Sequence, residues 1–263
     1  MTSWAVITHS DHSDKRWHAR QAFKYAGTQN TADVLLPELS SLLPHYTLCF
    51  IQQGEKYKLI ALLGLGGDRN LYVNQENYWM CHYVPATLRS YPFTQAENSE
   101  TGEKIFCIEE SHIADDSDAT AFAFFDSDNN MAPETAIAFN FLSQCEVSRV
   151  QTQAACNALA EAGVIEPWKL NIKRGENDEE PIALEGLYCI NEIALNEVYK
   201  PVLVRLRELG ALPLAYAQLF SMNQFAQLGQ RADYAAQQQE KAGSSLDLSG
   251  MFDEGESLNF DSL

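Results

Sequence analysis

The first half of the chain has the pattern of β-strands. Apolar residues run through 48–52 and 58–65 on either side of a polar loop at 53–56, which predicts a hairpin. Apolar stretches at 105–109 and 121–125, and a short one at 71–73, also predict strands. Residues 1–36 follow neither a helical nor a strand period, so we expect a partly helical arm that ends at Gly27. These elements predict a mixed, mainly antiparallel sheet.

The second half has mainly the pattern of helices. Apolar residues recur at helical spacing between 134 and 162, which predicts one or two amphipathic helices. Further helices are expected at 192–209, where Pro201 introduces a kink or a break, and from 212 to about 239. Between them, 167–172 and 182–190 predict one hairpin. The fold class is therefore α+β, and we expect 1–241 to form a single domain because no linker-like stretch interrupts it.

Charge narrows the range of partners. The chain has 36 acidic and 18 basic residues, a net charge of −18. Such a polyanion repels phosphate backbones, so we expect no nucleic-acid partner, and no apolar run is long enough for a membrane span. The six cysteines are widely spaced and no secretory signal is visible, which predicts free thiols and a cytoplasmic protein.

The arm at 1–36 contains basic residues and histidines. Its cations are expected to pair with carboxylates of the chain itself, the alternative being a site for an anionic ligand. His9, His12 and His18 lack the matched pattern of three or four ligands that a zinc site needs. We therefore predict no metal and no cofactor.

The segment 78–93 is the densest candidate for binding. It combines Trp79, Tyr83 and Tyr91 with a single cation, Arg89. Aromatic faces and one guanidinium suit a sugar ring, a carboxylate or an extended peptide. The alternative is that these rings belong to the core and that Arg89 binds backbone carbonyls.

Residues 242–263 form a tract of different composition. It contains five acidic residues, no basic residue and spaced apolar residues. We expect an acidic-hydrophobic tail that binds a partner through Leu248, Met251, Phe252 and Phe260. A tail that docks on its own body is the alternative.

Several short motifs occur in an order that resembles a known family. They include Pro37-Glu38-Leu39, Leu43-Pro44-His45-Tyr46, Tyr83-Val84-Pro85-Ala86, Gly186-Leu187-Tyr188 and Ala217-Gln218-Leu219-Phe220-Ser221. This order resembles the SapC family of bacterial surface-layer-associated proteins over about residues 12–230, and not the peptide-transporter permease that shares the name. The resemblance adds His12 as a ligand-binding candidate. It implies a surface-layer association, or an accessory role beside halogenases and cupin-type oxygenases.

Two functions follow as hypotheses. The first is a non-catalytic binding or accessory protein that recruits an enzyme or a cell-surface partner, such as a halogenase, an oxygenase or a surface protein, through the aromatic segment and the acidic tail. The alternative is a small-molecule-binding protein or enzyme with a cleft around Trp79, Tyr83, Arg89 and Tyr91. A pocket that joins Arg89 to a carboxylate or histidine of perturbed pKa favours the alternative, and a flat aromatic patch with a tail reaching outward favours the first. We favour the first, because no arrangement of serine, cysteine or histidine identifies a nucleophile.

Overall fold

The strands pair antiparallel in four sheets. The computed structural model describes residues 3–66, 68–97, 102–172 and 182–245. One sheet has five strands in the order β10 (Ile165–Pro167), β13 (Leu187–Ile190), β4 (Leu48–Gln53), β5 (Lys56–Leu62) and β3 (Thr31–Asp33). Two sheets have three strands, in the orders β1 (Trp4–Val6), β7 (Lys104–Glu109), β6 (Phe93–Glu97) and β8 (Ile113–Asp115), β2 (Lys15–Trp17), β9 (Phe122–Ala123). A fourth pairs β11 (Leu170–Ile172) with β12 (Ile182–Leu184).

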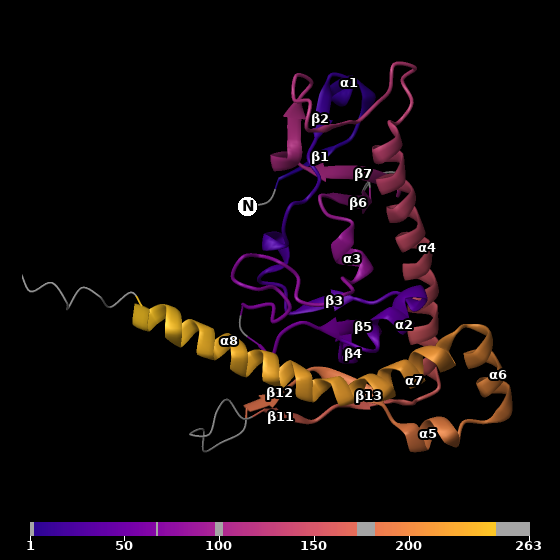
Figure 1. The fold of residues 1–263 in the computed structure, drawn as a ribbon. Coiled ribbons are helices and arrows are strands. Elements are labelled where there is room, and N and C mark those ends of the chain that lie inside the picture. Colours follow the sequence, from indigo (N-terminus) through magenta and orange to yellow (C-terminus); the bar gives the residue numbers. More distant parts are fainter. Residues whose placement is uncertain (1–2, 67, 98–101, 173–181, 246–263) are drawn as a thin grey trace, which may run out of the picture.

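Helices dominate the second half, as Figure 1 shows. The α-helices are α1 (His9–His12), α2 (Leu39–Leu42), α3 (Ala86–Arg89), α4 (Pro133–Glu161), α5 (Glu192–Asn196), α6 (Lys200–Glu208), α7 (Ala211–Ser221) and α8 (Phe225–Ser245). Short 3-10 turns are η1 (Lys24–Ala26), η2 (Leu36–Glu38), η3 (Glu110–His112) and η4 (Met222–Gln224). The α+β class, with antiparallel sheets and a helical C-terminal region, is confirmed.

The β4–β5 hairpin lies at the centre of the larger core. Its strands pair from Leu48 opposite Ala61 to Gln53 opposite Lys56. Gly54 closes the turn with φ of 60°, a conformation that glycine adopts without steric cost. Both faces of the hairpin are buried where it enters the core, because consecutive residues are buried in both strands, Leu48 to Phe50 in β4 and Leu59 to Leu62 in β5. A continuous apolar run, rather than an alternating one, follows from this two-sided burial.

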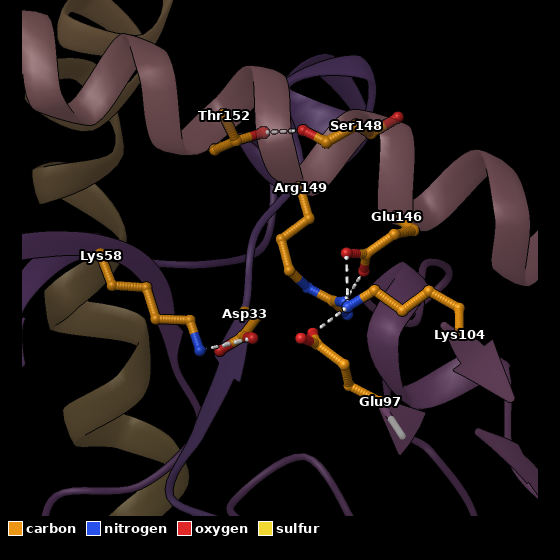
Figure 2. Close-up of polar contacts among 8 residues, drawn as sticks. All are labelled: Asp33, Lys58, Glu97, Lys104, Glu146, Ser148, Arg149 and Thr152. Atoms are coloured by element: carbon orange, nitrogen blue, oxygen red, sulfur yellow. Dashed lines mark hydrogen bonds and ion pairs between the residues drawn. The ribbon is translucent and has the colours of Figure 1, made fainter. Parts of the chain in front are cut away.

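Helix α4 joins the two parts of the fold. It begins at Pro133, whose missing N–H has no partner to lose in the first turn. Along its length it contacts β5 in the five-stranded sheet and β6 and β9 in the other sheets. Lys104 on β7 binds Glu97 at 2.9 Å and Glu146 of α4 at 3.3 Å, as drawn in Figure 2. This bridge ties the helix to the three-stranded sheet of β1, β7 and β6.

The N-terminal segment corrects one prediction. It is partly helical as expected, with α1 and with η1 ending at Gly27, but it is not an arm, because it also contributes the strands β1, β2 and β3 to the sheets. Strands of three residues are too short to show a period, and their partners in the sheet decide their conformation. The expected pairing of its cations with carboxylates is confirmed for two of them: Lys15 meets Asp115 at 3.0 Å and Arg16 meets Asp116 at 3.1 Å, whereas Arg20 donates to backbone carbonyls.

The stretch 71–73 corrects another prediction. It forms a turn with one isolated bridge, Val73 to Trp79, rather than a strand. The buried Asn70 side chain explains this, because its Oδ1 accepts from the Tyr72 amide at 2.9 Å and its Nδ2 donates to the Ala26 carbonyl at 3.0 Å. An asparagine that bonds the backbone two residues ahead favours a turn.

The remaining predictions for the second half are confirmed with sharper boundaries, except that the helix expected from 212 to about 239 is two helices, α7 and α8, separated by the 3-10 turn η4. A single helix, α4, spans the region of one or two predicted helices. Pro201 lies in the first turn of α6, so the predicted 192–209 helix is two shorter ones, α5 and α6. The predicted hairpin pairs β10 with β13 and β11 with β12, and its tip at 173–181 lies outside the described residues.

Candidate functional site

A buried carboxylate, Glu38, lies behind the aromatic segment. The side chain is 5% exposed at the end of η2. Its Oε1 accepts from the Leu35 amide at 2.9 Å, and its Oε2 accepts from the Ala86 amide at 2.8 Å and from the Tyr83 hydroxyl at 2.9 Å. Burial raises the pKa of Glu38 above its usual 4.5, while these three hydrogen bonds and the charge of Arg89 oppose the rise. Glu38 thereby holds the loop before α3 against η2.

Arg89 extends this network. Its guanidinium lies 4.9 Å from the centre of the Tyr83 ring and 5.2 Å from that of Phe141 on α4. Its Nη2 donates to the Tyr83 hydroxyl at 3.0 Å, so a chain of bonds runs from Arg89 through Tyr83 to Glu38. Burial raises the pKa of Tyr83 to about 12, which keeps its hydroxyl protonated at neutral pH. The guanidinium of Arg89 and the rings of Tyr83 and Phe141 therefore contact one another inside the protein.

Trp79 belongs to a neighbouring network. Its Nε1 donates to the hydroxyl of Tyr46 at 2.9 Å, and that hydroxyl donates to the backbone carbonyl of Tyr83. Tyr46 is fully buried and its ring lies 4.6 Å from that of Tyr72. The fold thus brings Trp79, Tyr83 and Arg89 together, and their hydrogen bonds hold one loop in place.

Tyr91 lies in a different environment. Its ring stacks on Tyr25 with centroids 3.8 Å apart, and its hydroxyl bonds the Glu109 carboxylate and lies 3.1 Å from His112 Nε2. An open hollow of about 310 Å³ is lined by Tyr91 and Tyr25, with Trp4 and other residues. Arg89 does not line this hollow. The two features expected of a cleft for a small molecule, an Arg89-linked carboxylate and a hollow, therefore occur at separate places.

His12 lies apart from the aromatic segment. It is 5% exposed and packs edge-on against Phe124, with ring centroids 5.0 Å apart. Phe124 belongs to a second core cluster that includes Trp17 and Phe93. Across residues 3–66, 68–97, 102–172 and 182–245, no three histidine, cysteine or acidic side chains gather closely enough to hold a metal ion.

A groove beside α8 contains residues that the sequence analysis did not single out. Two adjoining hollows of about 270 and 560 Å³ share Met80, Arg231 and Tyr234. We call them the α8 groove, which is lined by Arg69, Leu71, Val73, Asn74, Gln75, Glu76, Met80, Gln227, Gln230, Arg231, Tyr234, Ala235 and Gln238. Tyr234 and Met80 are exposed by 56% and 37%, and the nearby Tyr78 by 58%. The signal in the sequence that could have indicated this groove was a tyrosine, Tyr234, within a glutamine-rich helix.

Both arginines of the α8 groove are held in place by uncharged groups. Arg231 lies 4.5 Å from the centre of the Tyr72 ring and donates to Cys81 Sγ at 3.2 Å. Arg69 donates to the Ala235 carbonyl of α8 at 3.2 Å. Within the described part of the chain, neither forms an ion pair with a carboxylate. The groove is therefore locally cationic on a strongly acidic protein.

Comparison with known proteins gives one match. A family model described as SapC matches residues 7–228. The chain belongs to the SapC family. The SapC match includes the aromatic segment and the start of α8 and ends before the predicted tail. No curated protein and no solved structure matches the chain.

Two of the sequence predictions concern the rest of the chain. Among the helices that the structure describes, none combines the length and the apolar character that crossing a bilayer requires. The predicted partner-binding residues Leu248, Met251, Phe252 and Phe260 lie in 246–263, outside the described residues.

Proposed function

We propose that this SapC-family chain is a non-catalytic binding or accessory protein that holds a protein partner at the α8 groove, with the acidic tail taking part. One observation carries the proposal: exposed Met80 and Tyr234 line the groove together with two arginines that have no carboxylate partner within the described residues. The exposed Tyr78 is next to them, since its amide donates to Asn74, which also lines the groove. Exposed aromatic side chains and arginine are the residue types enriched where proteins bind each other.

The internal hydrogen-bond networks support the proposal, because they fix the loop beside which the partner would bind. Trp79 Nε1, the hydroxyls of Tyr83 and Tyr91, and Arg89 Nη2 all have hydrogen-bond partners inside the protein, whereas Arg89 Nε is buried without one. A loop fixed in this way loses little conformational entropy when a partner binds beside it. The proposal includes a cytoplasmic location, and its partner classes are those that the family resemblance implies: a halogenase, a cupin-type oxygenase or a surface protein.

The test compares matched variants of the full chain. Tyr78→Ala, Met80→Ala and Tyr234→Ala are combined in one variant, and Phe220→Ala on α7, whose side chain is 64% exposed, is the control. Proteins captured by the wild type are purified, and their binding to each variant is measured by calorimetry. We expect the combined variant to weaken binding at least about tenfold, since interface aromatics commonly contribute 1 kcal/mol or more each. Equal binding to wild type and the combined variant would refute the proposal.

A second function is favoured by the bonded chain from Arg89 to Glu38, whose pKa is raised. In this reading the chain binds or converts a small molecule near Trp79, Tyr83, Arg89 and Tyr91. Purified protein that turns over a metabolite, and loses that turnover in Tyr83→Phe without a change in melting temperature, would establish the second function and remove the first.

A further inference from the structure

We propose that the α8 groove is occupied by segment 246–263 of the same chain, which a protein partner must displace. This inference rests on the proposed function. To displace the segment, the partner must itself present carboxylates and apolar side chains. The segment and the groove are complementary in charge, in apolar character and in position along the chain.

The groove and the segment carry opposite charges. A guanidinium carries five N–H donors in a planar fork that fits a carboxylate. Arg69 and Arg231 each use one donor on an uncharged acceptor, a backbone carbonyl and a thiol sulfur. Glu76 is the one carboxylate among the residues that line the groove. Segment 246–263 contains five carboxylates and no cation.

The lining of the groove fits an extended peptide. Met80 and Tyr234 offer apolar surface to spaced apolar side chains, which the segment supplies at Leu248, Met251 and Phe252. Glutamine side chains donate and accept hydrogen bonds and can pair with an extended backbone. Three of them line the groove from α8: Gln227, Gln230 and Gln238.

Position along the chain makes binding within one molecule feasible. The segment follows directly after α8, and α8 ends seven residues beyond Gln238, a distance of about 10 Å at 1.5 Å per residue. Eighteen residues span at most roughly 60 Å, which is enough to return along the helix. A short tether also gives an effective concentration on the order of 1 mM, so a weak contact is enough to fill the groove.

The first experiment frees the groove without altering any residue that lines it. In the full chain, the five acids of the segment are replaced as Asp247→Asn, Asp253→Asn, Glu254→Gln, Glu256→Gln and Asp261→Asn. A fluorescent synthetic peptide of residues 246–263 is then titrated against this amide variant and against the wild type, with fluorescence anisotropy as readout. We expect the peptide to bind the amide variant about tenfold more tightly, as a tethered competitor at about 1 mM with a dissociation constant of about 0.1 mM requires.

Arginine variants locate the contact. In the amide-variant background, Arg231→Gln is expected to weaken peptide binding about five- to tenfold, as the loss of a partly desolvated arginine–carboxylate pair implies. Arg205→Gln on α6 is the matched control, because Arg205 is exposed and already pairs with Glu161 at 3.0 Å. Tyr234→Ala is a second groove variant, in case Arg231→Gln lowers the melting temperature. Binding should also weaken in 1 M salt, where the screening length is about 3 Å.

The outcomes separate the two proposals. Equal peptide binding to wild type and amide variant, or no binding to either, overturns the inference, while loss of partner binding in the combined variant of the groove leaves the proposed function standing. A wild-type dimer that becomes monomeric in the amide variant, measured by light scattering, overturns occupancy within one molecule and assigns the segment to a second copy.

Discussion

Replacing Glu38 by alanine tests whether the buried network stabilises the fold. The substitution removes the acceptor of two buried amides, those of Leu35 and Ala86, and of the Tyr83 hydroxyl. A buried donor left without a partner costs about 1–3 kcal/mol. Two such amides, together with the charge of Arg89 left uncompensated, give an expected loss of about 3–5 kcal/mol, against a total stability of about 5–15 kcal/mol.

Glu38→Gln refines this estimate. An amide oxygen facing Ala86 and Tyr83 accepts both of their bonds, but the amide nitrogen then faces the Leu35 N–H, and one donor remains without a partner. The expected loss is therefore smaller, about 1–3 kcal/mol. Urea unfolding followed by fluorescence measures both values. The exposed Glu76 is the control, and Glu76→Ala should stay within about 0.5 kcal/mol of wild type. A loss below 1 kcal/mol for Glu38→Ala would refute the network as described.

The free energy of unfolding of the wild type should depend on pH differently from that of Glu38→Gln. Burial raises the pKa of folded Glu38 above 4.5, so between these two values the folded state binds more protons than the unfolded state. The stabilisation linked to this proton is complete below 4.5 and is lost as pH rises through the raised pKa. Relative to Glu38→Gln, the free energy of unfolding of the wild type should therefore fall as pH rises. A difference that is constant with pH would contradict the raised pKa.

Other predictions address the core and the turns. Tyr46→Phe removes the hydroxyl that accepts from Trp79 Nε1, and should cost about 2 kcal/mol in urea unfolding; a loss under 0.5 kcal/mol would contradict the bond. Gly64→Ala places a Cβ 2.6 Å from the Arg69 carbonyl oxygen and close to an asparagine side chain, and should cost more than about 2 kcal/mol. Gly229→Ala, in α8 with open space around the new Cβ, should instead stabilise by up to about 1 kcal/mol; the opposite order of these two glycine variants would refute the packing.

The local pattern of residues was sufficient for the elements that carry their own signals. The β4–β5 hairpin has two long apolar strands and a glycine in its turn, and α4 has a proline at its start and a glycine after its end. These signals act within a few residues, so they can be read without the fold. The three-residue strands β1 and β2 have no such signal, because they are defined by the partners that they find in β7, β8 and β9.

The candidate site, too, was predictable from the sequence only in part. The aromatic segment was recognisable from composition, and SapC membership from the order of short motifs. The roles of individual side chains could not be recognised in this way. Trp79, Tyr83 and Arg89 share one region of the structure. Tyr91 instead contacts Tyr25 and Glu109, and His12 packs in another cluster.

Sequence alone established an acidic α+β protein of the SapC family with an aromatic segment and a tail of distinct composition. Only the tertiary structure decided that Arg231 lies over Tyr72 and beside Cys81, and that Glu38 receives bonds from residues 45 and 48 positions away. The physical reason is that composition and periodicity record which residues seek burial or water. Which of them meet depends on the path of the chain, and in this protein that path places α8 beside the loop at 69–80.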